Sequence, residues 1–432
     1  MRKSKWIKAA LLLAGVMVLS SCGTIDNGTT TEQVTEQMST GGKSGNDKST
    51  EGTTEQTTEA FTAEEEETII RRAKYADAVV MFYYANVWPD GTPIEGFDWD
   101  TMHENKFAIY DIDGDGIEEL ILSYTQTSIA GMREEIFQYD IETGELRSEL
   151  SEYPGTTYFS NGYVEVVWAH NQGVTTDMWP FNVYQYNADT DNYDYVASVD
   201  SWRKKDFPED YDGTPFPDEY DLDGNGDIYY ISTVGDGRKP VDDAEFEAWR
   251  NNIEQGTSVL TVPYGSDEDG GFETLLGYTQ EYKQLYYQKY IYTYGESAGD
   301  IGLRYFLDDS VYVGDLKPEL ENRYGITFTP ENEYGDSEIG TINNQTPIAM
   351  NYMNATLLIY QDTKVDDLTI FGIYPGMSEK EAKEHLAVAG FYEIEENGYI
   401  TGDNTNNVGI WLDTEGGIVK KLSIRTYCSY AG

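Results

Sequence analysis

Cysteine, histidine and basic residues are scarce in this sequence. It contains two cysteines, three histidines and 29 lysines and arginines, against 78 aspartates and glutamates, and its net charge is −49 at pH 7. A chain this acidic is not expected to bind nucleic acid or to dock electrostatically on anionic lipid. The same excess of carboxylates favours bound divalent cations.

Zinc chemistry is not indicated either. The histidines, His103, His170 and His385, are too far apart in sequence for a zinc-binding spacing, and no HExxH motif occurs. Cys428 has no local signature of a nucleophile. With 78 acidic residues, a pair of neighbouring carboxylates is expected by number alone and cannot identify a glycosidase. His170 is of interest only if it lines a pocket; a surface or structural histidine is the alternative.

A targeting pattern occupies the N-terminus. Residues 1–21 combine a basic start with an apolar run over residues 9–19, and residues 19–22 read Leu-Ser-Ser-Cys. This pattern closely resembles the signal peptides of bacterial lipoproteins, which implies cleavage before Cys22 and a diacylglycerol on its sulfur. The apolar run is too short to favour the alternative, a transmembrane anchor. We therefore expect the protein to be anchored through Cys22 on the outer, extracellular face of the cytoplasmic membrane.

Lipidation of Cys22 would have further consequences. It leaves Cys428 without a partner, so no intramolecular disulfide is expected. Loss of the four basic residues of the signal peptide would change the net charge from −49 to −53. Residues 22–61 are poor in apolar side chains and rich in Thr, Glu, Gly, Ser and Gln, which predicts a disordered tether. A tether of this length has a reach of roughly 35 Å.

The strongest motif in the remaining chain is an acidic loop between two apolar runs. After the strand-like residues 106–110 come Asp111, Asp113 and Asp115 at alternate positions. Gly116, Ile117 and Glu119 follow, and then the apolar residues 120–122. Carboxylates at alternate positions of a tight loop converge, which is favourable only with a hard cation such as Ca²⁺ among them. The alternative is a solvated acidic turn.

This loop matches the first half of an EF-hand loop, with side-chain oxygens at positions 1, 3 and 5, glycine at 6 and a backbone carbonyl at 7. Position 12 is Leu122 rather than the bidentate glutamate, and a strand follows instead of a helix. The loop therefore resembles the strand-loop-strand calcium loops of integrin-type FG-GAP repeats. That resemblance implies calcium ligands at Asp111, Asp113, Asp115, Ile117 and Glu119, although the ninth residue there is usually aspartate.

A second acidic loop has a weaker pattern. Asp221, Asp223 and Asn225 repeat the alternate oxygens, and Asp227 follows, but position 9 is Tyr229. With this ligand missing, the loop is interpreted either as a second calcium site or as a tight hairpin turn.

The predicted fold class is α+β. Residues 62–255 are expected to form a domain with a long N-terminal helix, capped by Thr62 and Glu65, over an antiparallel β meander, and a helix capped by Asp242 and Glu245. Residues 256–295 are predicted to be a connector and a helix from about Phe272, whose tyrosine stripe is interpreted as core, with sugar stacking as the alternative. Within residues 62–255, the order of helix, acidic loop, β meander and final short helix resembles a group of secreted or lipid-anchored proteins of Gram-positive anaerobes.

Residues 296–432 are predicted to form a smaller α+β module. It would contain a helix capped by Ser378 and Glu381, a hairpin over residues 408–424, and extra strands over residues 355–360 and 368–373. The module resembles the small lipoproteins of the SmpA/OmlA group and the β-lactamase-inhibitor-protein fold. Those families imply protein binding without catalysis.

Together these features predict a calcium-stabilised cell-surface lipoprotein that is a non-catalytic binding or scaffold protein of the bacterial envelope. Its expected partners are the membrane, through Cys22, and an envelope protein or polysaccharide. The alternative is a cell-wall or polysaccharide hydrolase that uses carboxylates. A deep pocket with two carboxylates roughly 5 to 10 Å apart would favour the hydrolase.

Overall fold

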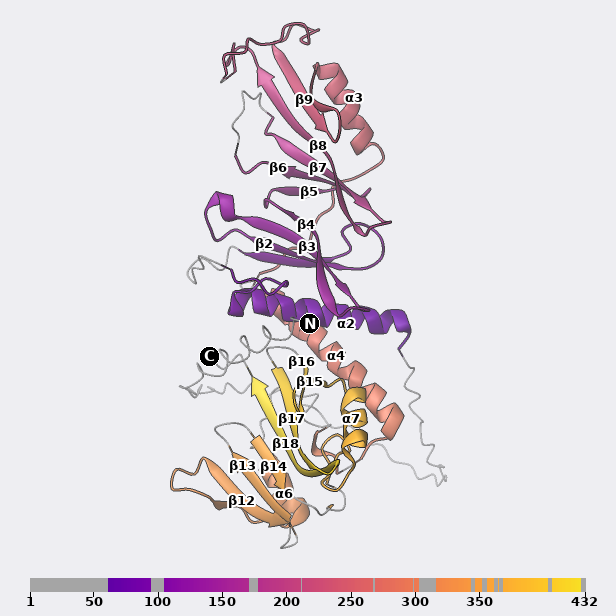
Figure 1. Ribbon diagram of the computed structural model, residues 1–432, viewed down its shortest axis with the longest axis vertical. Coiled ribbons are helices and arrows are strands. Elements are labelled where there is room, and N and C mark those ends of the chain that lie inside the picture. The colour runs from indigo at the N-terminus through magenta and orange to yellow at the C-terminus, as the bar shows by residue number, and fades with distance from the viewer. Residues whose placement is uncertain are drawn as a thin grey trace, which may run out of the picture. The chain divides into compact units, whose positions relative to one another are not determined.

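The computed structural model in Figure 1 describes most of the chain after residue 60. The described residues are 61–94, 105–170, 178–210, 212–266, 269–297, 299–302, 316–342, 346–351, 356–360, 364, 368–402 and 406–428. The predicted signal peptide, Cys22 and the predicted tether up to residue 60 lie outside this part of the chain, as does His103.

Helix α2 (Ala63–Val80) begins with the predicted capping box. The Glu65 N–H donates to the Thr62 hydroxyl over 3.2 Å, and the Thr62 N–H donates to the Glu65 carboxylate over 2.8 Å. The helix continues as a π-helical turn, η1 (Met81–Ala85), and ends at Asn86, whose φ is 55°. Asparagine tolerates this left-handed conformation, so the helix ends before the prolines and glycines that follow.

A four-stranded antiparallel sheet packs against α2 (Figure 1). Its strands follow chain order: β1 (Lys106–Tyr110), β2 (Glu119–Tyr124), β3 (Arg133–Asp140) and β4 (Glu145–Glu152). Every residue of β2 is buried, because the strand has apolar neighbours on both faces. Leu120 and Leu122 belong to the core shared with α2, whereas Ile121 belongs to a core shared with the next sheet, as the two-residue period of a strand requires.

The next sheet has six antiparallel strands in chain order. They are β5 (Thr156–Tyr158), β6 (Tyr163–Val167), β7 (Phe181–Asn187), β8 (Asn192–Arg203), β9 (Asp227–Thr233) and β10 (Gly237–Val241). Val164 and Val166 of β6 join the core with Ile121. Helix α3 (Asp243–Glu254) contributes Phe246 and Ile253 to a separate core with β7, β8 and β9. The predicted meander is thus two packed sheets, each with its own helix.

The C-terminal part contains a mixed-order sheet of eight antiparallel strands. Its order is β11-β12-β13-β14-β18-β17-β16-β15. The strands are β11 (Thr329–Pro330), β12 (Ser337–Ile342), β13 (Thr346–Asn351), β14 (Thr356–Tyr360), β15 (Tyr392–Glu395), β16 (Gly398–Gly402), β17 (Asn406–Glu415) and β18 (Ile418–Cys428). The helices that pack against it are α4 (Gly271–Tyr294), α6 (Lys317–Tyr324) and α7 (Glu379–Val388). Tyr290 of α4 belongs to the core of this sheet, whereas Leu275, near the start of α4, belongs to the core with α2. The α+β prediction is confirmed.

Several local predictions are also confirmed. The Glu381 N–H donates to the Ser378 hydroxyl at the start of α7. The predicted hairpin forms from β17 and β18 around Gly416 and Gly417, whose φ angles of 63° and 75° fit a two-residue turn of the kind that glycine favours. The tyrosine stripe of α4 is largely core, since Tyr282 and Tyr290 are buried. The predicted division of the chain into separate domains at residues 255 and 295 stays a prediction.

Two local predictions are wrong. Residues 368–373 do not form a strand; Phe371 and Gly372 have φ angles of 51° and 69°, which turn the chain. Asp242 occupies the N-cap position of α3, but its side chain makes no cap hydrogen bond, so the predicted capping box is absent there. Glu245 instead lies 3.2 Å from the Lys239 ammonium group.

Candidate metal centres

The first acidic loop connects β1 to β2, as a strand-loop-strand metal loop requires. The two strands pair antiparallel, with Tyr110 opposite Glu119. Asp111, Asp113 and Asp115 each offer a carboxylate oxygen, and these oxygens all lie within 4.8 Å of one another. The predicted convergence of the three aspartates is therefore present, and this cluster could hold a metal ion.

Backbone amides of the same loop orient these carboxylates. Asp111 accepts hydrogen bonds from the N–H groups of Gly114 at 2.8 Å and Gly116 at 3.2 Å. Asp113 accepts from Asp115 N–H at 3.0 Å through its Oδ1 atom. Both glycines have positive φ angles, 83° and 94°, which only glycine adopts readily. The amides therefore bond to both oxygens of Asp111 and to Oδ1 of Asp113, whereas Asp113 Oδ2 stays available for a cation.

Glu119, the predicted fourth acidic ligand, is buried, and it is not one of the carboxylates whose oxygens converge. Its exposed fraction is 0%, and its Oε2 atom accepts the Ile112 N–H at 2.9 Å. Its Oε1 atom and Asp113 Oδ2 are buried and have no hydrogen-bond partner. Burial raises the pKa of Glu119 to about 10 and that of Asp113 to about 6, with the neighbouring carboxylates as a further cause. Unpartnered buried oxygens beside three carboxylates fit a hard divalent cation.

The structure adds groups that the sequence pattern did not identify. Glu149 of β4 is buried, and its Oε2 atom has no hydrogen-bond partner. Burial, followed by the charges of Asp191 and Asp113, raises its pKa to about 8. Arg147 lies between these acids, 3.2 Å from Glu149 and in an ion pair with Asp191 in the turn between β7 and β8. These residues are far apart in sequence, and only the tertiary structure brings them near the loop.

Helix α2 fixes the end of the first loop. Arg72 forms two hydrogen bonds with the Glu118 carboxylate, at 2.6 and 2.9 Å. The buried Tyr75 hydroxyl donates to the Glu118 carbonyl oxygen at 2.7 Å and accepts the Tyr139 N–H at 3.1 Å. The loop is therefore joined to α2 through Tyr75, which lies 43 residues before Glu118 in the sequence. The Ile117 N–H donates to the Asp115 carboxylate. That the Ile117 carbonyl binds the cation stays a prediction.

The second acidic loop also brings carboxylates together, but not the predicted set. Asp221 and Asp223 have oxygens within 4.8 Å of each other and of Asp242, the N-cap residue of α3. Asp227 instead pairs with Arg203 of β8, with hydrogen bonds of 2.9 Å to each carboxylate oxygen. Asn225 donates from its side-chain amide to Asp223 at 3.1 Å. This cluster could hold a metal ion, with Asp242 taking part in place of Asp227.

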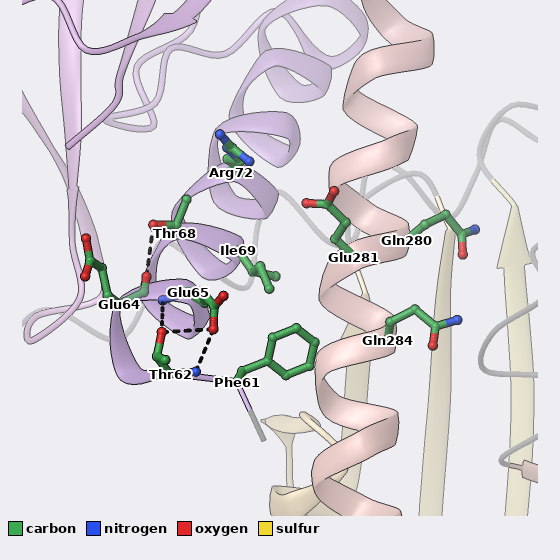
Figure 2. Close-up of a pocket in the computed structure, with 10 residues that line it drawn as sticks. All are labelled: Phe61, Thr62, Glu64, Glu65, Thr68, Ile69, Arg72, Gln280, Glu281 and Gln284. Atoms are coloured by element: carbon green, nitrogen blue, oxygen red, sulfur yellow. Dashed lines mark hydrogen bonds between the residues drawn. The ribbon is translucent and has the colours of Figure 1, made fainter. Parts of the chain in front are cut away.

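The described pocket lies between α2 and α4 and has a volume of about 680 Å³. It is lined by Phe61, Thr62, Glu64, Glu65, Thr68, Ile69, Arg72, Gln280, Glu281 and Gln284. Figure 2 shows Glu65 bonded back to Thr62, and these hydrogen bonds lower its pKa. A glycosidase acid has a raised pKa, so Glu65 is not suited to that role. None of the aspartates of the two metal clusters lines this pocket.

Neither of the two described histidines lines the described pocket. His170 is exposed. His385 lies on α7, where its Nδ1 atom is 3.1 Å from the Phe371 carbonyl oxygen and 2.8 Å from the Tyr290 hydroxyl. Its ring stacks on Tyr294 with a centroid distance of 3.8 Å. These contacts give His385 a structural role.

Residues 295–299 read Gly-Glu-Ser-Ala-Gly, which fits the GxSxG pattern of many serine hydrolases. In those enzymes the serine stands on a sharp turn from a strand into a helix. Here Gly295 is the C-cap of α4, and Ser297 is exposed just beyond the helix. The Ser297 hydroxyl accepts the Gly299 N–H at 3.4 Å, and no described histidine is hydrogen-bonded to it. The motif therefore lacks the context that would activate the serine.

Comparison with known proteins gives no match: no family model, curated protein or solved structure is significantly similar to this chain. Among the described helices, none is both long and apolar enough to span a membrane.

Proposed function

We propose that this chain is a calcium-stabilised lipoprotein of the bacterial cell surface that acts as a non-catalytic binding or scaffold protein. The observation that carries the calcium proposal is the convergence of Asp111, Asp113 and Asp115 beside the unpartnered, buried Glu119 Oε1 atom. Burying several negative oxygens together is unfavourable unless a cation neutralises them.

Calcium fits this ligand set better than other common ions. The converging groups are carboxylates, which are hard oxygen ligands, and no described histidine or cysteine belongs to either cluster. Calcium accepts six to eight oxygens in flexible geometry, whereas magnesium needs a near-ideal octahedron. Extracellular modules bind calcium with dissociation constants of roughly 0.1 to 1 mM, which suits a protein outside the cytoplasm.

Calcium should stabilise the folded protein. At ten times the dissociation constant, one bound ion adds about 1.4 kcal/mol to the free energy of unfolding. For a chain of this size the melting temperature should then rise by about 2 to 4 °C relative to chelator. Thermal melts followed by circular dichroism, with calcium and with EDTA, measure this difference.

A pair of variants assigns the effect to the first loop. Asp113→Ala should reduce the calcium-dependent rise in melting temperature, because it removes a converging carboxylate. Asp236→Ala is the matched control, since Asp236 is an exposed aspartate in the turn between β9 and β10. Equal melts of the unaltered chain in calcium and EDTA would reject calcium stabilisation.

The binding role rests on the predicted anchor and on the position of the acidic clusters. None of the aspartates of the two clusters lines the described pocket. Chemical crosslinking on intact cells, followed by identification of the crosslinked protein or polysaccharide, tests this role. Recovery of the chain without any crosslinked envelope component would argue against a scaffold.

A further inference from the structure

We infer that the second acidic loop and the first turn of α3 together form a second calcium site, in which Asp242 supplies the ligand that the loop lacks. The predicted ligand Asp227 is not part of it. This inference does not depend on the first site.

The two loops share three of their internal hydrogen bonds. Asp221 accepts the Gly226 N–H at 3.1 Å, as Asp111 accepts that of Gly116. Asp223 accepts the Asn225 N–H at 2.9 Å, which corresponds to the bond from Asp115 to Asp113. Asn225 accepts the Asp227 N–H at 2.6 Å, as Asp115 accepts that of Ile117. The first loop also has the bond from Gly114 to Asp111, whereas the corresponding Asp221 Oδ1 atom accepts none.

The loops differ at the ninth position. In the first loop this residue is Glu119, which places a buried carboxylate beside the aspartates. In the second loop it is Tyr229, whose ring stacks on Phe246 of α3 with a centroid distance of 4.2 Å and an interplanar angle of 6°. The tyrosine thus cannot be an acidic ligand, but it packs the helix against the strand that leaves the loop.

Because of this packing, the carboxylate of Asp242 lies beside the loop. Its exposed fraction is 7%, and its Oδ1 atom has no hydrogen-bond partner. One of its carboxylate oxygens lies within 4.8 Å of oxygens of Asp221 and Asp223. An aspartate at an N-cap normally accepts a hydrogen bond from the first helical turn, and this one does not. A buried, unpartnered carboxylate turned toward two others is stable only with a cation among them.

Two further oxygens support a cation at this point. Asp221 Oδ1 and Asp243 Oδ1 are also buried without a hydrogen-bond partner. Asp243 Oδ2 accepts the Asn225 side-chain amide at 2.8 Å, so the second helical residue is also joined to the loop. Asp221, Asp223 and Asp242 form no ion pair with a basic side chain in the described part of the chain, and these three carboxylates match a divalent ion with many oxygen ligands. The ion would bind the loop to α3.

Calcium stoichiometry tests this inference on the full-length chain. Equilibrium dialysis at about 1 mM free calcium, near the weak end for such sites, should give one equivalent less for Asp242→Asn than for the unaltered chain. Asparagine caps a helix as well as aspartate, so the helix itself should be unaffected, as circular dichroism would verify. Asp236→Asn, an exposed aspartate nearby in sequence, should keep the full stoichiometry.

The Asp113→Ala background separates this site from the first. In the Asp113→Ala variant, a second substitution, either Asp242→Asn or Asp221→Asn, should abolish the remaining calcium binding. If the first site does not bind calcium, the Asp242→Asn variant should still bind one calcium ion fewer than the unaltered chain. Unchanged calcium binding in folded Asp242→Asn would overturn the inference.

Discussion

Single residues in this protein differ in how their polar atoms are satisfied after burial. Glu119, Glu149 and Asp242 each keep a buried oxygen without a hydrogen-bond partner. The Ile112 N–H donates to the other oxygen of Glu119, and the Arg147 guanidinium donates to the other oxygen of Glu149. An unsatisfied buried polar atom costs about 1 to 3 kcal/mol, more if charged, so a cation that contacts such oxygens would be stabilising.

His385 provides a residue-scale prediction for the pH dependence of stability. Burial lowers its pKa below the ordinary value, although the charges of Glu381, Asp300 and Glu384 partly oppose this effect. The folded protein therefore favours the neutral ring more than the unfolded chain does. Its contribution to stability is complete above about pH 6.5 and decreases as the pH falls from there to the folded-state pKa.

Urea unfolding at pH 7.5 and 5.5 measures this contribution. The unaltered chain should lose more stability between these values than His385→Gln, because glutamine does not titrate. The comparison between the two proteins removes the contribution of the many carboxylates, which they share. Equal losses in both proteins would show that His385 does not cause the dependence.

At the scale of elements, α2 is both a cover for the first sheet and a support for the first loop. Its Tyr75 is fully buried and connects the Glu118 carbonyl to the Tyr139 N–H. The helix therefore stabilises the point at which the loop enters β2. Helix α3 has the corresponding place beside the second loop through Phe246 and Asp242.

Tyr75→Phe tests the support from α2. The variant leaves a partly buried carbonyl and a partly buried N–H without their hydroxyl partner, so the free energy of unfolding should fall by about 1 to 3 kcal/mol. Tyr292→Phe is the matched control, because Tyr292 is 89% exposed, and its effect should stay within about 0.5 kcal/mol. Urea unfolding at fixed pH measures both, and equal stabilities would contradict a structural role for the Tyr75 hydroxyl.

At the scale of the whole molecule, charge and anchoring determine where the protein can act. The net charge of −49 opposes attraction to anionic lipid, so attachment to a membrane requires another interaction. The predicted lipid on Cys22 would supply it, and the polar residues that follow would hold the folded part away from the surface.

Cys22→Ser tests this anchor in cells. Serine cannot form the thioether to diacylglycerol, so the variant should leave the membrane fraction and appear in the medium or remain with an uncleaved signal peptide. Cys428→Ser is the control and should fractionate like the unaltered chain. Fractionation followed by immunoblotting measures the distribution, and a membrane-bound Cys22→Ser with a cleaved signal would contradict lipidation.

Much of the fold follows from local patterns. The capping box at Thr62, the glycine turn at Gly416 and Gly417, and the alternating apolar residues of β2 are each encoded within a few residues. The first acidic loop is equally local, since its aspartates and glycines lie within six positions. Short-range hydrogen bonds and φ preferences are enough to determine such features.

The sequence by itself therefore determined the α+β class and the convergence of Asp111, Asp113 and Asp115. Only the tertiary structure decided which other carboxylates approach the two loops. Glu149 reaches the first through strand pairing, and Asp242 reaches the second because Tyr229 stacks on Phe246 and positions α3. Contacts between residues distant in sequence depend on how whole elements pack, and a local pattern contains no information about that packing.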